Sequence, residues 1–198
     1  MNGTQLAAVL DTACARLAST GDELRELDAE VGDGDLGITV TKSAAAVRTR
    51  MAALGADVSS TDVVLVAGEA FGTANPSTFA SLVSSGVKAG AKATDLTEVS
   101  TAEVVAFGRV VAETIARRGK SAVGDKTILD ALVPSLDAAE ANSEGAALEA
   151  AITAATAAIA ETAAIAAKKG RAAWAGDRGI GVPDAGATAY LRFLEALR

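Results

Sequence analysis

Apolar residues recur at the spacing of an amphipathic α-helix through most of the sequence, which limits the chain to a mainly helical fold. Leu10, Cys14 and Leu17, for instance, follow one another at intervals that place them on one helical face. Alanine, the best helix former, makes up about a quarter of the chain. Only three prolines occur, and runs of β-branched residues of strand length are few. We therefore predict an all-α protein.

The periodicity divides the chain into eight predicted helices with short connections, the arrangement of an up-and-down bundle. No internal repeat or low-complexity linker interrupts them, so we expect a single domain over residues 1–198. The predicted helices run from Leu6 to near Gly21, from Gly37 to Leu54, from Val63 to Phe71 with Asp62 as N-cap, from Pro76 past Val87, from Thr101 to Arg118, from the 119–126 loop to Glu140, over 146–169, and from Ala187 to Leu197.

Charge and composition exclude several classes of function. The net charge is −7, so the surface repels phosphate polymers and nucleic acid is not an expected partner. The chain has no histidine, which excludes a histidine base and imidazole zinc sites. With Cys14 as the single cysteine and no signal peptide, we expect a cytoplasmic protein. The alanine-rich run 146–169 carries Glu149 and Glu161, so we interpret it as a soluble helix and expect no membrane association.

Glycines gather in four of the connections, at residues 32–37, 72–75, 119–124 and 170–186. An up-and-down bundle brings alternate loops to the same end. We therefore expect several of these loops to meet at one rim, and the polar chemistry of the chain to be concentrated there.

The first of these loops carries the strongest functional signal. Asp28, Asp33 and Asp35 fall within eight residues, and the glycines between them allow a tight turn that gathers the carboxylates. Carboxylate oxygens suit magnesium, manganese or calcium, and the helix that follows Gly37 favours an anion at its N-terminus. On spacing alone, a solvated Asp-Gly turn with Asp35 as a helix cap explains the pattern equally well.

The other loops offer phosphate contacts, each with a structural alternative. The segment 72–76 precedes a helix and is either a phosphate cradle or an ordinary turn. Lys120 and Lys126 either meet a phosphate or remain in water. Arg171 and Arg178 present paired donors suited to phosphate, or they pair with charges at helix ends. We expect Trp174, the only tryptophan, to pack in the core.

Taken together and in this order, the loops resemble the nucleotide-binding L subunit of dihydroxyacetone kinases, over nearly the whole chain. The matching stretches are Leu27-Asp28-Ala29-Glu30-Val31-Gly32-Asp33-Gly34-Asp35, Gly124-Asp125-Lys126-Thr127-Ile128-Leu129-Asp130-Ala131-Leu132 with Pro134, and Gly170-Arg171 through Gly186-Ala187. The resemblance implies an eight-helix antiparallel barrel that holds ADP or ATP and two magnesium ions at one rim.

The same resemblance implies the roles of individual residues. It implies that Asp28, Asp33 and Asp35 bind the magnesium ions, and that these ions neutralise charge during catalysis. The nucleotide contacts that it implies fall on Leu36, Gly37, Ile38, Thr39, Thr73, Ala74, Gly119, Ile128, Arg171, Asp184, Ala185 and Gly186.

Three positions depart from the pattern of the family. Leu36 stands where histidine is frequent, and Thr73-Ala74-Asn75-Pro76 replaces an Ala-Ser-Gly-Pro loop, so that Ala74 lacks a hydroxyl. Ala185 stands where proline is common. Asn75 or Ser77 are candidates to replace the lost hydroxyl, and the magnesium carboxylates are intact.

The resemblance predicts a phosphotransferase subunit that passes a phosphoryl group to a small ketone or ketose on a separate, DhaK-like substrate-binding subunit. The donor is either exchanging ATP, or a retained ADP that a DhaM-like phosphocarrier protein rephosphorylates. A non-catalytic nucleotide-sensing or regulatory module is the alternative, which the altered 73–76 loop keeps open. A purely structural bundle, which predicts no metal dependence, is a third interpretation.

Overall fold

The computed structural model describes residues 1–142 and 145–198, which form nine α-helices and one 3₁₀-helix, with no β-strand. The predicted all-α fold is confirmed. In chain order the elements are α1 (Gly3–Ala18), α2 (Gly21–Val31), α3 (Leu36–Ala52), α4 (Ser60–Ala74), α5 (Thr78–Ala93), α6 (Thr101–Gly119), α7 (Ile128–Glu140), α8 (Ala147–Ala163), η1 (Arg171–Gly179) and α9 (Ala185–Ala196).

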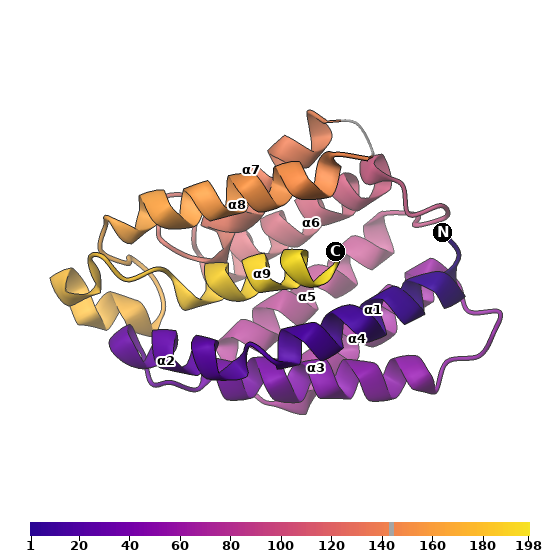
Figure 1. The fold of residues 1–198 in the computed structure, drawn as a ribbon, viewed down its shortest axis with the longest axis horizontal. Helices are drawn as coiled ribbons and strands as arrows, with labels where there is room; N and C mark the ends of the chain where they lie inside the picture. Colours follow the sequence, from indigo (N-terminus) through magenta and orange to yellow (C-terminus); the bar gives the residue numbers. More distant parts are fainter. Residues whose placement is uncertain (143–144) are drawn as a thin grey trace.

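The helices other than α2 run antiparallel to their neighbours and form a closed ring (Figure 1). From α3 to α9, each long helix packs against the next, and α9 returns to pack against α1. The predicted eight-helix up-and-down barrel is therefore confirmed among the described residues. The apolar core follows the ring in clusters between neighbouring helices, and one of them, with Leu24, Val40 and Ala189, joins α2, α3 and α9.

Helix α2 is the one α-helix among the described residues that the sequence prediction missed. Residues 21–31 form a separate helix that continues from α1, and Asp28 lies in its last turn rather than in an open loop. Leu24 is the only fully buried residue of this helix, so its apolar periodicity is weak. The prediction for 146–169 was also too long, because α8 ends at Ala163.

Helix capping follows side-chain chemistry, with one correction. Ser59, not Asp62, is the N-cap of α4, because the Ser59 hydroxyl accepts from the Asp62 amide at 3.0 Å. Thr127 caps α7 in a capping box with Asp130. These caps fix where the helices begin, and therefore which residues the connections present.

Small residues let neighbouring helices approach closely. On α5, a Cβ at Gly86 would meet Val111 of α6, and one at Gly90 would meet the Phe107 ring. A Cβ at Gly37, in the first turn of α3, would overlap the backbone of α2 at Gly21. The position of α2 against α3 therefore depends on a glycine.

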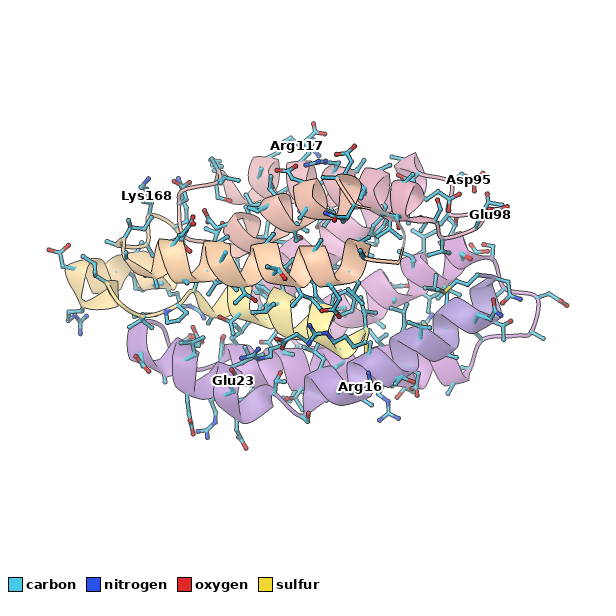
Figure 2. The ribbon with its side chains drawn as sticks, turned by 45° about the horizontal axis from the view of Figure 1, so that its top comes forward. Arg16, Glu23, Asp95, Glu98, Arg117 and Lys168 are labelled. Atoms are coloured by element: carbon cyan, nitrogen blue, oxygen red, sulfur yellow. The ribbon has the colours of Figure 1, made fainter. Side chains whose placement is uncertain are left out.

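The connections divide between the two ends of the ring (Figure 1). The segments 32–35, 75–77, 120–127 and 164–184 lie at one end, together with α2. Figure 2 shows Lys168 at this end and Asp95 and Glu98 at the other. The expectation that the glycine-rich connections meet at one rim is confirmed. Among the described residues, no helix has the length and apolarity that crossing a membrane requires.

Candidate functional site

Three carboxylates converge at the glycine-rich end. Asp28 comes from the last turn of α2, Asp33 from the connection, and Asp35 is the N-cap residue of α3. One oxygen of each lies within 4.8 Å of the other two, a spacing that suits a shared metal ion. The connection turns back sharply at Gly34, whose φ of 72° is the left-handed conformation that glycine adopts without strain.

The electrostatics of the cluster favour a cation. Desolvation raises the pKa of Asp28, a hydrogen bond from the Leu36 amide at 3.2 Å partly opposes this, and the charges of Asp33 and Asp35 raise the pKa further. Grouped carboxylates of this kind repel one another, and bound positive charge relieves the repulsion.

Arg171 supplies positive charge from the distant end of the sequence. Its Nη1 donates to Asp33 Oδ1 at 2.6 Å and to Asp35 Oδ2 at 3.1 Å. Arg171 is the first residue of η1, so the segment between α8 and α9 reaches across the rim to α3. The positively charged guanidinium therefore lies between the two carboxylates, where a metal cation would also be favourable.

A cavity of about 510 Å³ adjoins Arg171 at the N-terminus of α5. Arg118, near the end of α6, also lines the cavity and forms no ion pair with a described residue, whereas the adjacent Arg117 pairs with Glu113 at 3.9 Å. Two arginines, several hydroxyls and free helix N–H groups suit an anionic ligand. The lining residues are Pro76, Ser77, Thr78, Ser81, Leu82, Arg118 and Arg171.

The predicted nucleotide contacts on α3 and α4 lie near the cavity, and their side chains differ in how far they are exposed. Leu36 to Thr39 form the first turn of α3, where Ile38 is 48% exposed but Thr39 is fully buried. Thr39 Oγ1 accepts from the Asn75 amide at 2.9 Å, so this asparagine ties α4 to α3. Thr73 and Ala74 belong to the last turn of α4 and do not line the cavity, and the Thr73 hydroxyl donates to the Glu69 carbonyl.

The remaining predicted contacts occupy helix ends at the same rim. Gly119 ends α6 and Ile128 begins α7. Asp184 is the N-cap of α9, ahead of Ala185 and Gly186, and its carboxylate accepts from the Ala187 amide at 2.7 Å. Desolvation raises the pKa of Asp184 to about 6; the Ala187 hydrogen bond opposes the shift, Asp130 adds to it, and Lys126 opposes it.

Sequence reasoning missed three features of the site. Arg118 and Ser81 carry no motif signal, and only the packing of α5 against α6 brings them to the cavity. Lys126 is buried, whereas we considered only a phosphate contact or exposure to water. Trp174 is not in the core: it is 85% exposed, because it belongs to η1, which lies outside the ring, and it is flanked by Gly170 and Gly176, both at positive φ.

Comparison with known proteins identifies the family of this fold and site. The DAK2 domain matches residues 30–198. D-erythrulose kinase of Mycolicibacterium smegmatis is 34% identical over 190 residues, which cover 92% of this chain but 33% of that protein. The ADP-binding subunit DhaL of the PEP-dependent dihydroxyacetone kinase of Escherichia coli is 31% identical over 197 residues, covering 94% of this chain and 91% of the subunit.

The fold matches a solved kinase structure. The crystal structure of the dihydroxyacetone kinase from C. freundii in complex with AMP-PNP and Mg²⁺ superposes with a TM-score of 0.78 at 24% identity. The match covers 98% of this chain and 33% of that one, so the chain spans about a third of the larger kinases that it resembles. The family match and the identity to DhaL together show that this chain belongs to the DAK2 domain family.

Proposed function

We propose that this chain is the magnesium–nucleotide-binding subunit of a dihydroxyacetone-kinase-like phosphotransferase. The observation that carries the proposal is the cluster of Asp28, Asp33 and Asp35, bridged by Arg171 at the edge of a cavity lined with arginines and hydroxyls. The E. coli relative is named an ADP-binding subunit, and two M. smegmatis relatives are named erythrulose kinases, which supports a kinase role.

The donor set fits magnesium. Hard carboxylate oxygens suit this ion, which completes its coordination with phosphate and water oxygens. Asp28, Asp33 and Asp35 would hold up to two ions, and bound magnesium would neutralise charge on the phosphates of ADP or ATP. The ion pairs of Arg171 with Asp33 and Asp35 support this assignment, because they place positive charge between two of the carboxylates.

The residues of the chain bind and orient the nucleotide. We assign phosphate contacts to the N–H groups in the first turns of α3 and α9, from Leu36 to Thr39 and from Asp184 to Gly186, since helix N-termini favour anions. Arg171 also lines the cavity, so its guanidinium would contact a phosphate bound there. The resemblance also assigns nucleotide contacts to Thr73, Ala74, Gly119 and Ile128, the last two near the base; these residues occupy helix ends at the same rim and do not line the cavity.

The replacement of a serine by Ala74 does not leave the site without hydroxyls. Ser77, Thr78 and Ser81 line the cavity, although Ser77 also caps α5 by accepting from the Ala80 amide. These groups can donate to a phosphate in place of the missing serine. The altered 73–76 loop is therefore not by itself a reason to prefer the non-catalytic sensing module.

We propose that a separate, DhaK-like subunit holds the acceptor, a small ketone or ketose. The support is the likeness to DhaL, which is itself named as a subunit. Its name also gives phosphoenolpyruvate as the donor, which supports a DhaM-like phosphocarrier and a retained ADP; exchanging ATP is the other candidate donor.

The nucleotide site is tested by thermal unfolding. The midpoint is expected to rise with magnesium and ADP together, and much less with either alone, because magnesium removes the repulsion between the aspartates and the phosphates, and the phosphates complete the coordination of magnesium. Asp33→Asn and Asp35→Asn should each remove most of the rise. An unchanged rise in both variants would contradict the assignment.

The cavity is tested with adjacent arginines. Arg118→Ala should weaken magnesium–ADP binding on the order of tenfold in titration calorimetry, since one hydrogen bond to a charged group contributes about 1.5–3 kcal/mol. Arg117→Ala, which removes an exposed arginine paired with Glu113, is the matched control and should bind like the parent chain. Equal losses in the two variants would point to general electrostatic attraction.

A further inference from the structure

The segment 164–180 leaves the ring after α8 and returns to it before α9, and its two ends meet. The Gly181 amide donates to the Ala163 carbonyl at 2.7 Å, so residues on both sides of the excursion are in contact. The segment carries Arg171 to the aspartates and exposes Trp174. It has the form of a compact surface loop whose position depends on what holds its narrow base, here called the neck.

Lys126 holds the neck from the connection between α6 and α7. Its Nζ donates to the carbonyls of Gly179 at 2.7 Å, Ile165 at 2.8 Å and Ala163 at 3.3 Å. An ammonium group has three N–H donors, and all three are used on the two sides of the neck. The side chain is buried, with 4% of the residue exposed, so water does not compete for these bonds.

The backbone around Lys126 is built to aim this side chain. Lys126 has φ of 61°, a conformation that costs free energy in any residue but glycine. The connection is fixed by Asp130, whose carboxylate accepts from the amides of Gly124 at 2.5 Å and Thr127 at 2.6 Å. A second tie to the segment runs from the Lys168 amide to the Asp125 carbonyl at 3.0 Å. Because this backbone conformation favours glycine, the presence of lysine indicates that the ammonium group is needed at this position.

We propose that Lys126 is a positioning residue for Arg171. By joining the two sides of the neck, its ammonium holds the segment so that the guanidinium stays at the aspartates and within reach of a bound phosphate. Lys126 does not touch Asp28, Asp33, Asp35 or the cavity, so it acts on them through Arg171, while its charge also acts on Asp184 at the N-terminus of α9. The expected effect on nucleotide binding rests on the proposed function. The three hydrogen bonds by which Lys126 joins the two sides of the neck, here called the clamp, do not depend on it.

The first test is a double-mutant cycle on magnesium–ADP binding, measured by titration calorimetry. Lys126→Met keeps the length of the stem and removes the ammonium, and it should weaken binding about as much as Arg171→Ala, each on the order of tenfold. If Lys126 acts through Arg171, the double variant should bind no more weakly than Arg171→Ala. A double variant that multiplies the two losses, or a Lys126→Met variant that binds like the parent chain, would overturn the proposal.

The second test needs no ligand. Amide hydrogen exchange over residues 164–181 should rise on the order of tenfold in Lys126→Met, while α4 keeps its protection. Lys168→Met is the matched control: this lysine lies in the same segment, its side chain is 61% exposed, and its ion pair with Asp125 is long, at 3.8 Å, so its loss should change exchange at the neck little. Unchanged exchange in Lys126→Met would overturn the clamp.

The two tests separate the clamp from the proposed function. If the parent chain does not bind magnesium–ADP, the proposed function fails, and hydrogen exchange alone decides on the clamp. If Lys126→Met does not fold, Lys126→Gln replaces it in both measurements, because its amide keeps two of the three donors.

Discussion

Asp184 shows how a single side chain links the site to the stability of the protein. Its carboxylate caps α9 and lies near Asp130 and Lys126 in a partly buried position. Burial raises its pKa from 3.8 to about 6, so the native protein binds its proton more tightly than the unfolded chain does. The ionised form is therefore costly near neutral pH, as is typical of side chains kept for binding.

The pH dependence of Asp184→Asn follows from the sign of this shift. Between the unfolded pKa and about pH 6, the native state holds more protons, so the contribution of Asp184 to stability falls as pH rises through this window. Asparagine keeps the cap without the charge. Denaturation by urea should show the variant gaining up to about 3 kcal/mol on the parent chain at pH 7, and little at pH 4. A difference that is equal at the two pH values would contradict this.

At the scale of the element, the glycine contact between α2 and α3 sets the carboxylate geometry. Gly37 leaves no room for a side chain against Gly21 and Arg25. Because Asp28 is on α2 and Asp35 is the N-cap of α3, a shift between these helices separates two of the carboxylates that we propose as metal ligands.

Gly37→Ala should therefore weaken the stabilisation by magnesium and ADP and should lower the free energy of unfolding by roughly 1–3 kcal/mol, the usual cost of overpacking. Thermal unfolding with and without the ligands measures both. Gly55→Ala is the control, because a Cβ there meets nothing within 4 Å. Equal ligand-induced shifts in the two variants would show that α2 tolerates the displacement.

What the sequence predicted at this scale depended on the strength of the local signal. The long helices of the ring carry apolar residues at regular intervals, and their order was predictable. Helix α2 buries only Leu24 completely, and η1 packs outside the ring, so neither gives a clear period. The aspartates were found because glycine spacing and family resemblance mark them. The positions of Arg118 at the cavity and of Lys126 at the neck were not predicted, because contacts between segments distant in the sequence determine these positions.

At the scale of the whole molecule, the residues around the cavity indicate whether the chain could phosphorylate an acceptor by itself. The cavity beside Arg171 is lined by arginines and hydroxyls, and the carboxylates at its edge are the three aspartates proposed to hold magnesium. The chain also has no histidine. Both observations are consistent with an acceptor that is held and activated elsewhere.

The 198-residue chain by itself is therefore expected not to phosphorylate dihydroxyacetone or erythrulose at a useful rate, even when it binds magnesium and ATP. A coupled assay for ADP release, with and without an added DhaK-like subunit, measures this. Asp33→Asn in the same mixture is the control for contaminating kinases. Robust turnover by the chain alone, lost in Asp33→Asn, would show that the acceptor site lies within it.

The closure of the ring between α1 and α9 also determines the order in which the protein can fold. Helix α9 follows every other helix in the chain, and it supplies Ala185 and Ala189 to the cluster that holds Leu36. Arg171 likewise comes 138 residues after Asp33. During synthesis, the aspartates therefore leave the ribosome long before their partner, and an incomplete chain exposes apolar faces of α1 and α7. Such long-range closure slows folding, and the nascent chain can bind nucleotide in the manner proposed only after the segment before α9 has been made.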